Sequence, residues 1–189
     1  MSFPSGPSNV HPPHRIEVNL RNVGQLFNTM DPSPFHEKDL DGDAEAFIES
    51  WANEFPVEEP VTLVVHLAET PDITAAQAMI EVAVRHHFAD RYRLNRLEFR
   101  RLMHDGRRSL LIGLLFLGSC LLVGNMLPRQ PAGTVIGLIR ESLTIGGWVA
   151  MWRPLEIYLY DWWPLRRTGR IYAKLSQIAV EVRQAVRPV

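Results

Sequence analysis

Apolar residues follow different spacings along this chain, and each spacing predicts a different kind of element. They alternate with polar residues over 15–20, which predicts a strand. Residues 61–67, VTLVVHL, are β-branched and almost continuously apolar, which is typical of a strand buried on both faces. Residues 43–55 carry apolar side chains at helical spacing, so we expect a helix that buries this face: Ala44, Phe47, Ile48, Trp51 and Phe55.

A second amphipathic helix is expected to begin near Ile73. Its apolar positions recur at helical spacing as far as Tyr92, and it continues as a stalk over 73–108. Residues 14–72 with the start of this helix therefore form a small α/β head of order β-α-β-α. Because two strands alone are rarely stable, we expect the sheet to gain strands from another copy or a partner.

The segment 109–127, SLLIGLLFLGSCLLVGNML, contains no charged residue over its 19 positions. At 1.5 Å per residue, a helix of this length nearly matches a hydrocarbon core of roughly 30 Å. We interpret it as a first transmembrane helix, followed by a turn over 128–133 and a second transmembrane helix over 134–152. The predicted architecture is thus an α/β head fused to a two-helix transmembrane hairpin.

Arginines set the expected orientation of this hairpin. They crowd both its ends, whereas the turn holds only Arg129, so the positive-inside rule places both termini in the cytoplasm. Residues 153–167 would form an interfacial segment interrupted by prolines, with an aromatic belt of Tyr158, Tyr160, Trp162 and Trp163. Residues 168–189 show apolar residues at spacings of three and four, which predicts a C-terminal amphipathic helix.

The formal net charge of −1 hides a strong asymmetry. Residues 1–72 carry 13 acidic side chains against three basic ones, whereas residues 85–108 carry eight arginines against three acidic side chains. Anionic lipid headgroups account for the basic collar next to the membrane better than nucleic acid does. The lead-in 1–13 has the Pro, Ser and Gly content of a disordered segment.

Two sets of residues in the predicted hairpin are candidates for helix association. Charges inside a bilayer are costly and need polar partners, so Arg140 and Glu141 are expected to form a polar clasp with Asn125 or to line a water-filled path in an oligomer. Small residues allow close helix approach, within one hairpin or between copies. These small residues are Gly113, Cys120, Gly124, Gly133 and Gly137.

The chain contains no motif that we recognise as catalytic, and we expect no cofactor and no enzyme activity. A calcium loop counted from Asp39 would need glycine at position 44 and glutamate at position 50, where the chain has Ala44 and Ser50. A membrane-bound enzyme would require a pocket that gathers His36, His66 or His87 with carboxylates. Cys120, the single cysteine, lies in the apolar segment, where desolvation makes a thiol a poor nucleophile.

The leading functional hypothesis is a membrane-anchored interaction or scaffold protein, or an accessory subunit. We expect it to be a homo-oligomer in the bacterial inner membrane, bound to an unidentified protein partner. The expected recognition surface is acidic and consists of Phe35, Asp39, Asp41 and Asp43. The alternative is an oligomeric channel or transporter-associated subunit that uses Arg140 and Glu141.

Overall fold

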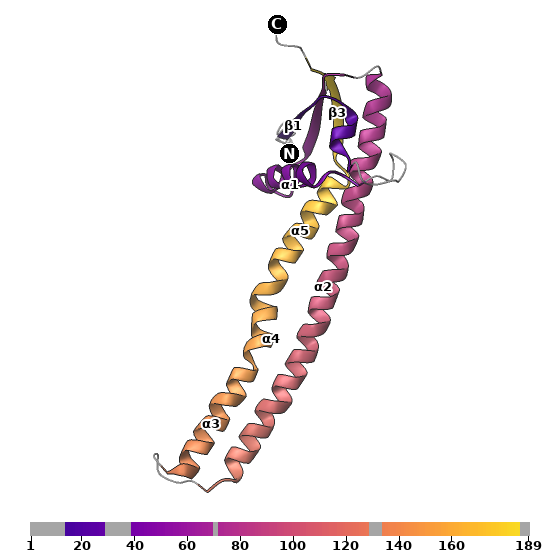
Figure 1. The fold of residues 1–189 in the computed structure, drawn as a ribbon. Coiled ribbons are helices and arrows are strands. Elements are labelled where there is room, and N and C mark those ends of the chain that lie inside the picture. Colours follow the sequence, from indigo (N-terminus) through magenta and orange to yellow (C-terminus); the bar gives the residue numbers. More distant parts are fainter. Residues whose placement is uncertain (1–13, 29–38, 70–71, 129–133, 186–189) are drawn as a thin grey trace, which may run out of the picture. The chain divides into compact units, whose positions relative to one another are not determined.

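The computed structural model describes residues 14–28, 39–69, 72–128 and 134–185, which divide into two compact units (Figure 1). The head unit comprises residues 1–93 and 169–189, and the helical unit comprises residues 94–168. The head unit therefore includes the beginning of the predicted stalk and most of the predicted C-terminal segment.

The head unit is built on a three-stranded parallel sheet of order β1-β2-β3. Its strands are β1 (His14–Leu20), β2 (Val61–Leu67) and β3 (Ala179–Gln184). The central strand β2 is almost completely buried, as the apolar run over 61–67 predicts. The α/β class and the first two strands are thus confirmed.

The third strand corrects the predicted C-terminal helix over 168–189. Helix α5 (Trp162–Leu175) ends in a turn in which the Ile178 amide donates to the Leu175 carbonyl. From there Ile178, Val180 and Val182 alternate with more exposed residues, which is the period of a strand. The sheet therefore gains its third strand from this chain's own C-terminal region instead of from another copy.

Two helices cover one face of the sheet. Helix α1 (Gly42–Glu54) contributes Ile48 and Ala52 to the core, and α2 (Ile73–Met126) contributes Ile80 and Phe88, among other residues. The predicted orientation of α1 is wrong in part, because Phe47 and Trp51 lie on its exposed side and Glu45 is buried instead. A short 3-10 helix, η1 (Val23–Leu26), follows β1 in the chain.

The other face of the sheet is polar. Because side chains alternate along a strand, the register places Glu17, Val64 and Glu181 side by side on this face, with Asn19, His66 and Arg183 next to them. His66 Nε2 lies 3.7 Å from Glu17 Oε2, and Arg183 donates to Glu181 over 2.8 Å. The pattern agrees with the alternation of charge and apolarity along β1.

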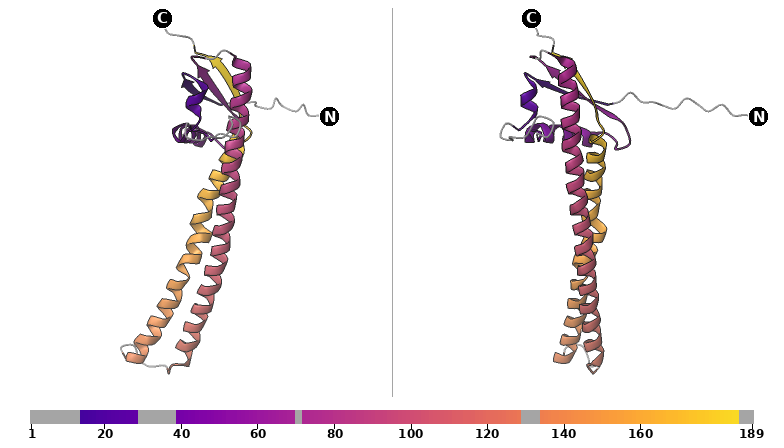
Figure 2. Two further views of the ribbon diagram at one scale, coloured as in Figure 1. Left: turned by 45° about the vertical axis from the view of Figure 1, so that its right-hand side comes forward. Right: turned by 90° about the vertical axis from the view of Figure 1, so that its right-hand side faces the viewer.

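Helix α2 runs without interruption through 54 residues, and both views of Figure 2 show it as one continuous helix. Its first part packs in the head unit, and its last part contains the apolar segment 109–127. Among the helices of the described residues, α2 is long and apolar enough to cross a membrane, and only 17% of its most apolar stretch is buried.

The helical unit also contains a second run of helical segments: α3 (Val135–Ala150), α4 (Trp152–Glu156) and the π-helical segment η2 (Ile157–Asp161), followed by the start of α5. Pro154 and Pro164 were expected to interrupt this run, but both lie within helical segments. Pro154 is the third residue of α4, where the missing backbone N–H costs little, whereas Pro164 lies in α5, three residues after the π-helical segment η2. The π-helical turn between them changes the hydrogen-bond register locally.

Candidate functional site: a buried polar network in the head unit

A buried cluster of charged side chains joins α1 to α2 inside the head unit. Arg91 donates a hydrogen bond of 2.5 Å to Glu45 Oε2, and Glu45 is 8% exposed. His87, 6% exposed and one helical turn before Arg91, brings its Nε2 within 3.4 Å of the same carboxylate oxygen. The hydrogen bond to Glu45 raises the pKa of Arg91 above its ordinary value, so this guanidinium stays charged across the physiological range.

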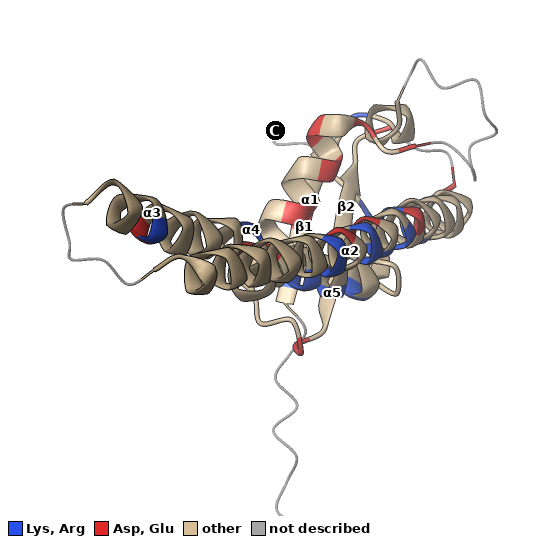
Figure 3. Ribbon diagram, turned by 90° about the horizontal axis from the view of Figure 1, so that it is seen from below, with Lys and Arg blue, Asp and Glu red and all other residues tan. Residues whose placement is uncertain are grey.

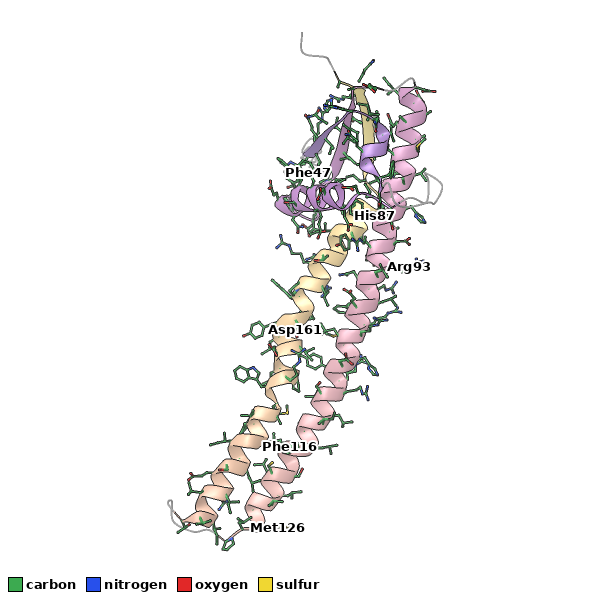
Figure 4. All side chains as sticks on the ribbon, in the orientation of Figure 1. Phe47, His87, Arg93, Phe116, Met126 and Asp161 are labelled. Atoms are coloured by element: carbon green, nitrogen blue, oxygen red, sulfur yellow. The ribbon has the colours of Figure 1, made fainter. Side chains whose placement is uncertain are left out.

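His87, which is labelled in Figure 4, also contacts the residues directly before α1. His87 Nδ1 lies 3.2 Å from Asp39 Oδ1 and 3.4 Å from the backbone amide of Leu40. Phe27 and Leu40 form an antiparallel β-bridge, and the Asn28 amide donates to the Asp39 carbonyl. The network therefore joins α2 to α1 and to residues 39 and 40.

A second polar contact joins α1 to α5. The hydroxyl of Tyr172 donates to Glu49 Oε2 over 3.3 Å, and its ring lies near that of Phe88. Burial, followed by the negative charge of Glu49, raises the pKa of Tyr172 to about 12. At neutral pH this hydroxyl is therefore a hydrogen-bond donor and not a base.

The raised pKa predicts a stability change at high pH. Between pH 10 and pH 12 the unfolded chain releases the Tyr172 proton while the folded chain keeps it, so the free energy of unfolding falls as pH rises. Because Tyr172 is only half-buried, solvent screening limits the effect to about 1 kcal/mol. The free energy of unfolding is measured at pH 9 and pH 11 for detergent-solubilised wild type and Tyr172→Phe. From pH 9 to pH 11 it should fall by more in wild type than in Tyr172→Phe. Equal losses would contradict this assignment.

The chemistry available in this network is charge and hydrogen bonding. Within the part of the chain that the structure describes, no three His, Cys, Asp or Glu side chains are placed to hold a metal ion. His66 and His87 are not brought together, since His66 lies on the polar face of the sheet and His87 on a helix that covers the opposite face. His36 lies outside the described residues.

The structure describes Asp39, Asp41 and Asp43 of the expected recognition surface. Asp41 caps α1 by accepting a hydrogen bond of 3.0 Å from the Asp43 amide, as its place before the helix predicts. Asp43 is exposed, and Asp39 is exposed while contacting His87. Phe35 lies outside the described residues. Sequence reasoning missed Glu45 and Arg91, although His87 and Arg91 share a helical face at a spacing of four residues.

In the helical unit, several predicted small residues lie where α2 meets the second helical run. A Cβ atom at Gly113 would lie 3.0 Å from Met151 Sδ, and Cys120 is buried. At Gly124 the nearest atom would be Arg140 Cγ at 3.8 Å, an ordinary contact. Gly137 donates its amide to the capping hydroxyl of Thr134, and Gly133 lies outside the described residues.

The closest approaches occur at two other glycines, Gly106 and Gly147. A Cβ atom at Gly106 would lie 2.9 Å from Ile157 Cγ2, and one at Gly147 would lie 2.8 Å from Leu117 Cδ1. Both glycines are buried. Gly106 precedes the apolar segment, where no pattern of small residues points to a helix contact.

The structure does not join Arg140, Glu141 and Asn125 by hydrogen bonds or ion pairs. Arg140 is half-buried, and Glu141 and Asn125 are exposed. Within the described residues, neither charged side chain has a partner of opposite charge within 4.0 Å. The predicted clasp and the predicted path therefore both stay predictions, and each would need a second chain or another group to complete it.

The aromatic residues predicted as a belt follow one another along η2 and the start of α5. Tyr160 and Trp163 are each 70% exposed, and Tyr158 is 37% exposed. The indole of Trp162 donates to the Tyr158 carbonyl over 2.8 Å, and Arg166 lies over its ring. Nearby, Arg153 donates to both Glu156 and Asp161.

Comparisons of the chain with protein-family models, with curated proteins and with solved structures gave no match. Conclusions on function therefore depend on the geometry described above.

Proposed function

We propose that this chain is an integral membrane protein that holds its α/β head at one membrane surface as an interaction or scaffold module. The exposed apolar side chains of α2 carry this proposal. Leu111, Ile112, Leu115 and Leu122 are each more than 60% exposed. Such a surface is unfavourable in water and favourable in lipid.

The parallel sheet supports a second membrane crossing. Strand β2 precedes α2 in the chain, β3 follows α5, and the two strands are hydrogen-bonded to each other. Both strands must therefore lie on the same side of any membrane that α2 crosses. The chain would recross it between Met126 and Ala179, where α3 supplies 16 helical residues that span about 24 Å and gain length from α4.

The arginine distribution supports a cytoplasmic head with both termini on that side, as in the inner membrane of a bacterium. The exposed Arg107 and Arg108, which directly precede the apolar segment, would contact anionic headgroups, and the exposed tyrosines and tryptophans of the second helical run would lie at the interface. A binding role suits the head because its buried network fixes the acidic entry to α1.

The experiment that tests this role is extraction of the full chain in mild detergent, with native mass measurement and identification of bound proteins. We expect oligomers or a stable complex with a second protein. A reporter that is active only in the cytoplasm should be active when it is fused after Val189. A monomer without partners, or a reporter on the other side, would contradict the scaffold role or the orientation, respectively.

A second candidate function rests on the charges in α3. Because Arg140 and Glu141 have no ion-pair partner within the described residues, copies of the chain could arrange them around a water-filled path. Glu141→Gln is then expected to change ion or solute flux in reconstituted vesicles severalfold without changing oligomer mass. A change in oligomer mass or stability alone would exclude the channel and favour a structural clasp.

A further inference from the structure

The outer face of α1 carries aromatic and acidic side chains that the head core does not use. Asp43, Phe47, Trp51 and Glu54 follow one another at helical spacing on this face. Phe47 is 42% exposed and Trp51 40% exposed, and their ring centroids lie 6.1 Å apart. The opposite side of α1 is held in the core by Ile48 and Ala52, which fixes the outward direction of the aromatic pair.

The charge of this face limits what can cover it. Helix α1 contains four acidic residues and no lysine or arginine, and only acidic colouring marks it in Figure 3. An anionic membrane surface would repel such a helix, although it would accept the aromatic rings. The fitting occupant is therefore basic and partly apolar, so that it can pair with Asp43 and Glu54 and cover Phe47 and Trp51.

The chain itself contains such a surface on α2. Leu94 and Leu97 are 52% and 44% exposed, and exposed arginines lie beside them on the helix surface. Within the described residues, Arg100 and Arg101 have no ion-pair partner. One shallow hollow is lined by Leu97, Arg100, Arg101 and His104, together with Asp105. The basic segment, residues 93–104, thus offers leucine to the aromatic pair and guanidinium groups to both carboxylates and rings.

We propose that α1 of one copy docks on the basic segment of α2 in a second copy of this chain. Charge complementarity supports this occupant. Helix α1 contains acidic residues and no lysine or arginine, whereas the basic segment carries exposed arginines and leucines.

The contact joins two different surfaces, so each copy has one of each to offer. Such a heterologous contact closes into a ring when the rotation between copies permits. This inference rests on the proposed membrane anchoring, because anchoring is what brings copies together in one membrane. It adds the identity of the partner and the contacting residues to the proposed scaffold role.

Cross-linking between differently tagged full-length chains in intact membranes tests the docking. Both chains carry Cys120→Ser; one carries Trp51→Cys and the other Leu97→Cys. We expect a short bis-maleimide to join the two tags. The matched control replaces Trp51→Cys with Val82→Cys, an exposed position of the head on α2, and should cross-link at least about tenfold less.

Charge exchange between copies separates docking from chance proximity. Asp43→Lys with Glu54→Lys in the Trp51→Cys chain should lower the cross-link yield about tenfold. Arg100→Glu with Arg101→Glu in the other chain should restore most of it. Restoration also shows that the first variant is folded, because an unfolded head could not recover its partner.

The remaining outcomes overturn the proposal. Chains that pellet with the membrane but form no specific cross-link would exclude docking between copies and leave membrane anchoring intact. A cross-link to a different protein, or labelling of Trp51→Cys by a lipid-attached reagent, would assign α1 to another occupant. Chains found outside the membrane fraction would overturn the proposed function itself.

Discussion

A chain that ends at Gln177 is expected to lose the folded head, because it lacks β3. Val180 and Val182 are 3% and 7% exposed, and each contributes about 1.5–3 kcal/mol through burial. Loss of both, together with the hydrogen bonds between β2 and β3, is comparable to the typical total stability of about 5–15 kcal/mol. Limited proteolysis of membranes should digest the head of the truncated chain and spare that of wild type.

A chain that ends at Ala185 is the matched control, since it keeps β3 and the hydrogen bond from the Ala185 amide to the Leu67 carbonyl. It should resist protease as wild type does. The same reasoning predicts that residues 14–93, joined to residues 169–185 by a flexible linker, fold as a soluble domain. Equal protease resistance of the chain ending at Gln177 would show that β3 is dispensable.

The double variant Leu115→Lys with Leu122→Lys is expected to disappear from the membrane fraction. Both side chains are 65% exposed, so neither substitution breaks packing within the described chain. In lipid each lysine costs about 2.5–3.5 kcal/mol near the centre of a helix, whereas in water the change would improve solubility. The amount of protein in membranes after alkaline extraction, compared with wild type, measures the difference.

The control substitution for this pair is Val82→Lys in the head unit, where the Val82 side chain is 54% exposed. It should leave the membrane-bound amount close to that of wild type. If the lysine pair were retained as well as Val82→Lys, the exposed apolar side of α2 would not face lipid.

The local elements of the head could be predicted because their signals are local. Residues 61–67 are apolar over a length that suits a buried strand, and Asp41 stands where a capping residue is needed before α1. The long α2 follows from apolar spacing and from the absence of proline between Ile73 and Met126. These features need no information from distant parts of the chain.

The third strand could not be predicted in this way, because its partner is distant in sequence. Ile171, Leu175, Ile178 and Val182 fit a helical stripe, while Ile178 and Val182 also fit the alternation of a strand. The deciding contact is the pairing of Val182 with Val65, more than a hundred residues earlier. Once β2 offers an unpaired edge, the strand pairs the backbone groups of this buried edge, which a continued helix would leave without partners.

The orientation of α1 and the buried network could not be predicted for a related reason. Phe47 and Trp51 fit the helical spacing of apolar residues that predicts a buried face, whereas the charge of Glu45 gives no indication of burial. Glu45 is buried because Arg91 and His87, on a helix more than 40 residues later, supply compensating contacts. A buried carboxylate of this kind is predictable only when its partner is known.

Membrane residence of α2 is the central claim, and cysteine accessibility tests it most directly. In a Cys120→Ser chain, Ile112→Cys, Leu115→Cys and Leu122→Cys place thiols at positions that are at least 65% exposed, and Ser50→Cys places one on the exposed side of α1. In membrane preparations in which a charged maleimide reaches both sides of the bilayer, we predict labelling of Ser50→Cys only. After denaturation in detergent, we predict labelling of all four positions. Labelling of the three α2 positions as fast as Ser50→Cys in intact membranes would contradict the account.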